Sequence, residues 1–259
     1  MAKSKYEYVK QFERETVFLP HTWLVVRIDG QGFHRFTATH DFEKPNDLRA
    51  LELMNRCARG VFDQVGGICF AYGESDEYSF VVHENSQYFN RREAKLVSSI
   101  VSLFTSLYVF YWPTVFPDRQ LKYPPSFDGR IVCYPTEAIL RDYLAWRQVD
   151  CHINNLYNTC FWTLVQSGKS TVDAERELMG TLSADKNEML FTKFGINYNK
   201  LPSIFRKGSI IVRDYVEEEH TDKATGEIRK KRKMRTVVVH EDIIKNKFWE
   251  QRPHILGKK

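Results

Sequence analysis

The sequence is poor in cysteine, and the cysteines that it has form no recognisable framework. Five occur among 259 residues, and no two of them stand in a Cys-x-x-Cys pair. Their odd number and scattered positions fit neither a disulfide framework nor a zinc site. The first fourteen residues are charged and lack the apolar core of a signal peptide. These absences predict a protein of a reducing compartment, the cytoplasm, with the nucleus as an alternative.

Low-complexity tracts and internal repeats are also absent, which argues against disorder over most of the chain. Hydrophobic residues make up 42% and charged residues 27%, as in an ordinary globular protein. The length suffices for one large domain or for a compact core with an appended module. The net charge of +5 permits an anionic partner without requiring one.

One long run, residues 96–117, lacks charged side chains and is just long enough to suggest a transmembrane helix. Serine and threonine recur within it at helical spacing, as Ser98, Ser102, Thr105 and Ser106. They form a small polar stripe along which another element can pack closely. We therefore predict a buried core helix and no membrane partner, with a membrane span as the alternative.

The first third of the chain shows a mixed pattern of strands and helices. Residues 23–28 form a short β-branched run before an Asp-Gly pair, which predicts a buried strand ending in a turn. Residues 48–65 follow a capping Asn or Asp and carry apolar side chains at three- and four-residue intervals, which predicts an amphipathic helix. Two apolar runs, 68–72 and 78–82, predict antiparallel strands joined by a tight turn.

The pattern changes further along the chain. We expect a helix around residues 91–111, a proline-rich connection, and a strand near residues 130–133 that completes the central sheet. The sequence is then chiefly helical until a second hairpin near residues 209–239. We expect a core at residues 1–134 and an accessory region at residues 135–259, packed together as one compact unit.

A basic run, RKKRKMR at residues 229–235, faces three glutamates at residues 217–219 across an expected turn at residues 224–227. Cross-strand ion pairing explains this arrangement well. A nucleic-acid patch or a nuclear import signal is the alternative. The charge run alone does not decide between them.

The residues best suited to catalysis stand where the predicted strands end. Asp29 follows the first strand, and Asp76 and Glu77 lie at the tip of the hairpin. If these strands are neighbours in the sheet, three carboxylates face one point. Carboxylates repel unless a cation lies between them, and oxygen ligands suit magnesium, which completes its shell with water and substrate phosphates. The pattern predicts a magnesium site for a triphosphate, with a plain turn and a solvated hairpin tip as the structural alternatives.

The segment GQGFH, from Gly30 to His34, continues directly from Asp29. Its glycines let backbone N–H groups approach phosphate oxygens closely, as a phosphate-binding loop requires. This signal is weak by itself and gains weight from the acidic hairpin.

Three longer motifs carry a resemblance that covers almost the whole chain. They are RIDGQGFHRF at residues 27–36, YGESDEYSF at residues 72–80 and HINNLYNT at residues 152–159. Together and in this order they resemble the tRNA-histidine guanylyltransferase family, eukaryotic type. Three long motifs are more specific than any short pattern, and we find no departure at a functional position.

The resemblance implies an α/β (α+β) fold with a palm similar to that of polymerases and nucleotide cyclases. Such a palm has a mostly antiparallel sheet backed by helices. In this chain it would form a catalytic core at residues 1–134, followed by a helical and hairpin accessory region. The resemblance also implies that two magnesium ions are held by Asp29 and Asp76. The backbone carbonyl of Gly30 would be a further ligand, and Glu77 would support the site.

The activity implied by the resemblance is the addition of a guanylate to the 5′ end of tRNA-histidine. ATP would activate the 5′ phosphate, the 3′ hydroxyl of GTP would attack it, and pyrophosphate would leave. Two metal ions can clamp the attacking and leaving oxygens of such an in-line displacement. Relatives form tetramers, so we expect a homotetramer.

The family's nucleotide site maps onto one loop and one turn of this sequence. The matching residues are Asp29, Gly30, Gln31, Gly32, Phe33, His34, Ser75 and Asp76. Lys44 and Asp47 are further candidate contacts to the nucleotide. His34 is a candidate for stacking on a base, and a surface imidazole in a turn is the alternative.

Further residues are candidates for contacts to phosphate or RNA. Those for a second triphosphate or the tRNA 5′ end are Arg27, Arg92, Lys95 and Arg130, with solvated surface charges as the alternative. Those for reading RNA through imidazole or amide groups are His152, Asn155 and Asn158. Tyr157 or Trp162 could offer a stacking surface, although a core position is the favoured explanation for Trp162.

Two other functions fit part of the pattern. A palm-type nucleotide cyclase, or another nucleotidyltransferase without an RNA substrate, could use the same acidic hairpin and would turn over nucleotides alone. A non-catalytic tRNA-binding protein could keep the fold for recognition only. The intact set of carboxylates speaks against this last function.

Overall fold

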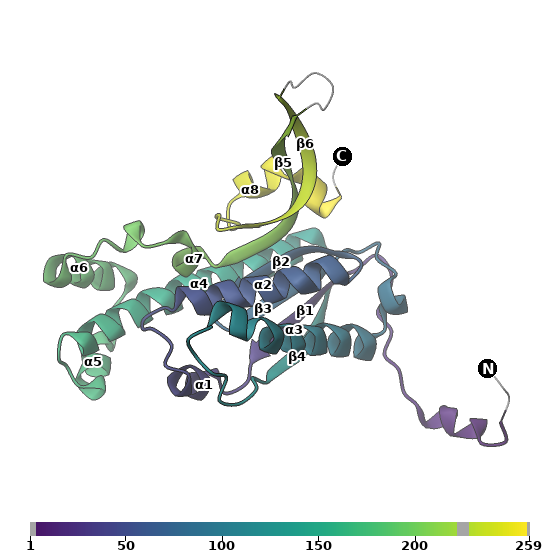
Figure 1. Cartoon of the computed structure of the whole chain (residues 1–259), viewed down its shortest axis with the longest axis horizontal. Helices are drawn as coiled ribbons and strands as arrows, with labels where there is room; N and C mark the ends of the chain where they lie inside the picture. Colours follow the sequence, from purple (N-terminus) through teal and green to yellow (C-terminus); the bar gives the residue numbers. More distant parts are fainter. Residues whose placement is uncertain (1–3, 222–227, 258–259) are drawn as a thin grey trace.

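The computed structural model describes residues 4–221 and 228–257, which form one six-stranded sheet with helices on both faces (Figure 1). The strand order is β4-β1-β3-β2-β5-β6, and every neighbouring pair is antiparallel. The strands are β1 (Trp23–Gly30), β2 (Ile68–Glu74), β3 (Glu77–Val82), β4 (Phe127–Tyr134), β5 (Ser209–Thr221) and β6 (Ile228–Val239). The predicted α/β (α+β) fold with a mostly antiparallel sheet is confirmed.

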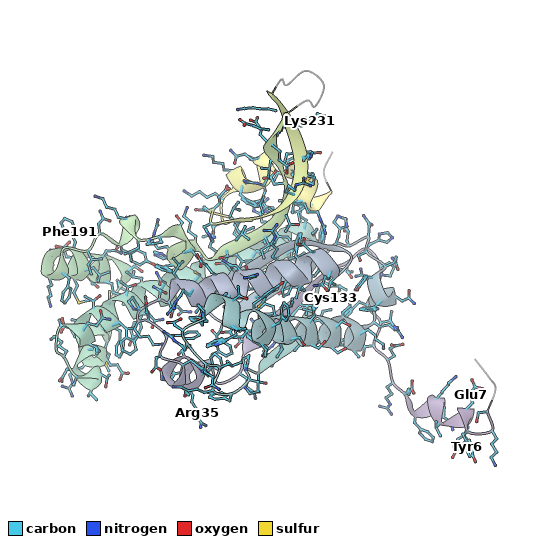
Figure 2. The ribbon with its side chains drawn as sticks, viewed as in Figure 1. Tyr6, Glu7, Arg35, Cys133, Phe191 and Lys231 are labelled. Carbon is cyan, nitrogen blue, oxygen red and sulfur yellow. The ribbon has the colours of Figure 1, made fainter. Side chains whose placement is uncertain are left out.

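Helices lie between β1 and β2, between β3 and β4, between β4 and β5, and after β6. The α-helices are α1 (Phe33–Thr39), α2 (Leu48–Gln64), α3 (Glu93–Val115), α4 (Glu137–Gln166), α5 (Thr171–Leu178), α6 (Ser183–Phe194), α7 (Ser203–Lys207) and α8 (Asn246–Gln251). Short 3₁₀ segments are η1 (Glu7–Phe12), η2 (Tyr88–Arg91), η3 (Tyr198–Lys200) and η4 (Pro253–Leu256). The segment with η1, which carries Tyr6 and Glu7, extends away from the body of the molecule (Figure 2).

Two hydrophobic cores lie on opposite faces of the sheet, because successive side chains of a strand point to opposite sides. On β1, Leu24, Val26 and Ile28 join α2 and α3 in one core. Trp23 and Val25 join α4, α8 and η4 in the other. A strand buried on both faces reads as a nearly continuous apolar run, as residues 23–28 do apart from Arg27.

The sheet is larger than the sequence predicts. We expected it to be complete with the strand near residues 130–133, and this expectation was wrong. β5 pairs with the free edge of β2, with Phe70 opposite Val212 and Gly73 opposite Ser209. The physical reason is that residues 209–212 are buried, so the start of the second hairpin belongs to the sheet and not to a separate layer.

Beyond this buried start, β5 and β6 leave the sheet as a two-stranded arm, with Lys231 near its end (Figure 2). Ion pairs cross the arm from Lys230 to Glu217 at 3.7 Å, and from Lys233 and Arg235 to Glu218 at 3.2 and 2.6 Å. The predicted cross-strand pairing is thus confirmed for this part of the basic run. The expected turn at residues 224–227 lies outside the described residues, and the nucleic-acid and nuclear-import alternatives stay predictions.

α3 is the helix predicted from the uncharged run, and by length and composition alone it could also span a membrane. One face is buried in the core, with side chains four residues apart: Leu96, Ile100, Phe104, Tyr108 and Trp112. The predicted core position is confirmed for this face. The absence of a membrane partner stays a prediction.

The polar stripe of α3 does not serve as its packing face in the described chain. Ser98, Ser102 and Ser106 are exposed, and the hydroxyls of Ser102 and Thr105 bond to backbone carbonyls of the same helix. Our expectation of close packing along this stripe was therefore wrong. Burying the large apolar side chains removes more apolar area from water than burying the serine stripe would, and this difference decides which face of α3 turns inward.

We expect Phe104→Ala to lower the free energy of unfolding by about 3–5 kcal/mol, because it leaves a cavity in the core. Phe110→Ala is the matched control on the same helix, since Phe110 is 71% exposed and Phe104 is 0% exposed. The control should change stability by no more than about 0.5 kcal/mol. Urea unfolding of both variants measures this, and equal losses would show that the assignment of the two faces is wrong.

Candidate active site

The end of β1 and the turn between β2 and β3 lie side by side. Asp29 is the register partner of Glu77, and the backbone N–H of Gly30 donates to the carbonyl of Asp76 at 3.1 Å. The prediction that these strands are neighbours in the sheet is confirmed. Asp29 and Asp76 are both half-buried and both line the same cavity.

The two aspartates influence each other electrostatically. Burial raises the pKa of Asp76, a hydrogen bond from Ser75 opposes the rise, and the nearby charge of Asp29 adds to it. Within residues 4–221 and 228–257, no group of three or more His, Cys, Asp or Glu side chains is placed to hold a metal ion. Two carboxylates suffice for magnesium, which commonly takes one or two from the protein and the rest from substrate phosphates and water. The donor set therefore fits magnesium.

Glu77 does not join the two aspartates, so the prediction that three acids face one point was wrong for this residue. Its carboxylate accepts a hydrogen bond from Arg147 on α4 at 2.8 Å and lies 3.7 Å from Arg27. These arginines offset the charge of Glu77. A supporting role for Glu77 stays a prediction.

The glycine loop after Asp29 is shaped by close contacts. A side chain at Gly30 would come within 2.3 Å of the Phe33 ring and 2.8 Å of the Asp76 carboxylate, so only glycine fits. Gly32 has a φ of 67°, a left-handed conformation that glycine adopts without strain, and it precedes α1. The loop therefore reverses tightly beside the carboxylates. Contact of the loop with phosphate stays a prediction.

α1 is held in place from the connection between α3 and β4. The ring of His40 is fully buried, with Nδ1 2.9 Å from the carbonyl of Phe36 and Nε2 2.9 Å from the backbone nitrogen of Lys122. The Lys122 N–H must donate, so Nε2 accepts and the proton lies on Nδ1. The guanidinium of Arg119 also donates to the His40 carbonyl at 2.7 Å. A neutral imidazole thus anchors the helix that follows the glycine loop.

A cavity of about 720 Å³ joins the aspartates to one wall of α4. Of the residues predicted for the site, it is lined by Asp29, Phe33, His34, Lys44, Asp47, Ser75, Asp76, Glu77, Asn155 and Asn158. The predicted stacking candidates Tyr157 and Trp162 line it as well. Among the described residues, those predicted for the site but not lining it are Arg27, Gly30, Gln31, Gly32, Arg92, Lys95, Arg130 and His152.

Lys44 and Asp47 have defined contacts at the cavity wall. The ammonium of Lys44 donates to Thr37 at 3.2 Å and lies 5.6 Å from the centre of the Trp162 ring. Burial lowers the pKa of Lys44, and Asp47 opposes this. Asp47 caps α2 by accepting from the backbone N–H of Arg49 at 3.0 Å. Asp47 therefore has a structural role, whether or not it also contacts a nucleotide.

The three residues predicted to read RNA have different surroundings. Asn155 is 7% exposed and uses its amide to bond Asn46 and Tyr198, both at 3.0 Å, so it ties elements together. The ring of His152 packs edge-on against Tyr198. Asn158 is exposed on the cavity wall, where an RNA base could reach it. The RNA contacts stay predictions.

The four predicted phosphate contacts lie outside the cavity. Arg27 is near Glu77, as described above. Arg92 pairs with Glu15 at 3.1 Å, Arg130 pairs with Asp128 at 3.3 Å, and Lys95 is exposed. Their role at a second triphosphate or at the tRNA 5′ end stays a prediction.

Sequence reasoning missed Arg147, which is buried at the cavity beside Glu74, Glu77 and Asp150. Burial raises the pKa of Glu74 to about 8, and the charge of Arg147 opposes this. A signal was present in the sequence. Arg147 interrupts the apolar stripe that α4 turns inward, and buried arginines are rare unless paired.

Comparison with known proteins identifies the family of this chain. The profile of the family described as tRNAHis guanylyltransferase matches residues 6–135, and that of the Thg1 C terminal domain matches residues 138–245. The chain is 54% identical over 260 residues to a probable tRNA(His) guanylyltransferase of Dictyostelium discoideum, and the match covers 100% of both chains.

Two solved structures share the fold. The crystal structure of the tRNA(His) guanylyltransferase from Saccharomyces cerevisiae superposes with a TM-score of 0.76 at 47% identity, covering 80% of this chain and 93% of that one. A bacterial tRNA(His) guanylyltransferase (Thg1)-like protein in complex with ATP also gives a TM-score of 0.76, at 22% identity, covering 99% of this chain and 100% of that one.

Fold, site and relatives together define an enzyme of the nucleotidyltransferase class. The chain belongs to the tRNA(His) guanylyltransferase family.

Burial lowers the pKa of His40 below its ordinary 6.5. The unfolded chain therefore takes up a proton at a higher pH than the folded chain, and folding loses stability as the pH falls below about 6.5. This one group contributes at most about 1.4 kcal/mol per pH unit.

We expect His40→Asn to show a shallower decrease of unfolding free energy between about pH 6.5 and pH 5 than the unsubstituted protein. Urea unfolding across this range measures the slope. His34→Asn is the control, because His34 is exposed, and it should keep the original slope. An unchanged slope in the His40 variant would show that His40 does not stay neutral in the folded chain.

Proposed function

We propose that this protein adds a guanylate to the 5′ end of tRNA(His), using two magnesium ions at Asp29 and Asp76. The observation that carries the proposal is the pair of facing carboxylates, which two neighbouring chain segments present to one large cavity. The names of the relatives support tRNA(His) as the substrate. The bacterial relative's complex with ATP supports nucleotide binding in this fold.

The residues at the cavity have different roles, which follow from their chemistry. Asp29 and Asp76, with the carbonyl of Gly30, would hold the magnesium ions, which when bound offset phosphate charge during an in-line displacement. The N–H groups of Gly30 and Gln31 already donate to the carbonyls of Asp76 and Ser126, so the phosphate contacts proposed for the loop would fall to the N–H groups that follow them. The ammonium of Lys44 lies at the cavity wall, where it can offset phosphate charge.

The reaction then runs in three stages. ATP transfers its adenylyl group to the 5′ monophosphate of the tRNA and releases pyrophosphate. The 3′ hydroxyl of GTP then attacks the activated 5′ phosphorus and displaces AMP, and hydrolysis finally removes pyrophosphate from the 5′ triphosphate of the added nucleotide. The cavity continues from the carboxylates to the exposed amide of Asn158 and the ring of Tyr157 on α4. This continuation favours an RNA substrate over a cyclase that uses nucleotides alone, because exposed amides and aromatic rings suit unstacked bases.

The remaining parts of the proposal concern the wider context of the enzyme. Arg27, Arg92, Lys95 and Arg130 contact a second triphosphate or the tRNA 5′ end. The protein acts in the cytoplasm as a homotetramer. Several subunits would bind one tRNA, because one globule of 259 residues is only a few nanometres across and shorter than a tRNA. The mass of the protein–tRNA complex in solution tests this stoichiometry.

The direct test is incorporation of labelled GTP into 5′-monophosphorylated tRNA-histidine that lacks the extra G, with ATP and magnesium. We expect Asp29→Asn and Asp76→Asn each to lower the rate at least about 100-fold, because each removes a charged ligand. Asp142→Asn is the control. Asp142 is exposed on α4 and lies outside the cavity.

Labelling at the original rate by either aspartate variant would contradict the proposed metal ligands. A non-histidine tRNA should remain unlabelled. Consumption of nucleotides without any labelled tRNA would instead support the enzyme that needs no RNA.

We expect Asn158→Ala and Asn155→Ala to differ in what they damage. Asn155→Ala should lower the unfolding free energy by about 1–3 kcal/mol, because it leaves buried hydrogen-bonding partners unsatisfied. Asn158→Ala should keep the original stability and raise the KM for tRNA. Urea unfolding and steady-state labelling separate the two effects, and an unchanged KM in the Asn158 variant would remove this residue from the RNA site.

A further inference from the structure

Arg147 contacts three carboxylates from a position inside the fold. It is only 6% exposed. Its guanidinium donates to Glu77 at 2.8 Å, to Glu74 at 3.1 Å and to Asp150, one turn along α4, at 2.7 Å. Hydrogen bonds between charged partners of this length are strong and directional. Arg147 therefore fixes the distance between α4 and the β2–β3 hairpin.

The hairpin needs such a partner because of its own charges. Glu74 ends β2 and Glu77 begins β3, and the two are directly opposite each other in the register. Carboxylates at opposed positions repel when both are ionised, and the charge of Glu77 is one of the causes, after burial, that raise the pKa of Glu74. The two residues between them are Ser75 and Asp76, and Ser75 has a φ of 49°, which a non-glycine residue rarely adopts. Arg147 bonds to both glutamates and so holds the two flanks of this tight turn.

We propose that Arg147 is a positioning residue that sets the turn presenting Asp76, so that cation binding depends on the placement of α4. The proposal rests on the proposed function, in which Asp76 binds the cation. Arg147 acts through Glu74 and Glu77 and not by contact with the nucleotide. The same helix carries Asn158, so the placement of α4 connects the RNA-facing wall with the cation site.

The charge of Arg147 and its positioning role predict opposite effects on cation binding. A positive charge close to a cation site repels the cation, so an arginine that acted only through its charge would weaken binding. Removing it would then tighten binding. An arginine that positions a ligand has the opposite effect when removed, because residues that orient metal ligands typically contribute a factor of 10–100 in metal affinity.

The test is the binding of Mn²⁺ to the full chain without nucleotide, measured from the electron paramagnetic resonance of the free ion. We expect Arg147→Gln to weaken binding about tenfold. Arg147→Lys keeps the charge but loses the fork of donors, so we expect weakening here also. Glu77→Gln should also weaken binding, and the losses of the two single variants should not add fully in the double variant, since each removes the Arg147–Glu77 contact.

Arg176→Gln is the matched control, because Arg176 pairs with Asp173 at 3.0 Å on the exposed surface of α5. Its Mn²⁺ affinity should not change. Thermal unfolding of every variant identifies loss of the fold, and Arg147→Lys remains informative if Arg147→Gln does not fold. Steady-state labelling should show a lower kcat for the Arg147 variants with little change in the KM for tRNA.

Tighter or unchanged Mn²⁺ binding in folded Arg147 variants would overturn the positioning role while leaving the proposed function intact. Additive losses in the double variant would also overturn it. If the unsubstituted protein bound no Mn²⁺, or if Asp76→Asn bound it equally well, the proposed metal site would fail and the positioning role would fail with it.

Discussion

The antiparallel pairing of β1 with β3 is the constraint on which the rest of the site depends. It places Asp29 opposite Glu77 and lets the N–H of Gly30 bond to the carbonyl of Asp76. A slip of one residue would turn Asp29 toward the core of α2 and α3. That slip would also turn Arg27 into the same apolar core and away from Glu77. Burying these charges without partners is costly, and this cost protects the register.

The site concentrates negative charge in a place that is partly removed from water. Asp29, Asp76, Glu74 and Glu77 come from two adjacent chain segments, and burial raises the pKa of the last three. Burying charge is costly unless a partner compensates it. The chain compensates the glutamates with Arg147 and Arg27 but leaves the two aspartates without a basic partner among the ion pairs described. This division separates carboxylates that build the hairpin from carboxylates that can take a cation.

Much of this architecture could be predicted from local patterns in the sequence. Residues 23–28, the helix at residues 48–65 and the hairpin strands at residues 68–72 and 78–82 all appear where periodicity and turn residues indicate them. The convergence of Asp29 with Asp76 followed from the same patterns, because both stand at strand ends.

What could not be predicted depends on contacts between distant parts of the chain. Periodicity does not say which strand edge receives β5, nor which face of α3 turns inward. Arg147 and Glu77 lie 70 residues apart in the sequence, so no local sequence pattern indicates the ion pair between them. The amide of Asn155 made it a candidate for contact with RNA. Only the folded structure shows that this amide already bonds to Asn46 and Tyr198.

The late position of β5 in the chain has a consequence for synthesis on the ribosome. β2 carries the flank of the catalytic turn, and one of its edges is covered only by residues 209–212. Until those residues leave the exit tunnel, the nascent chain exposes the unpaired backbone of a buried, apolar strand. Such an edge is a template for pairing with other chains. The enzyme therefore completes its catalytic sheet only after residues 209–212 have emerged, and a chain that stops at residue 134 would emerge with that edge open.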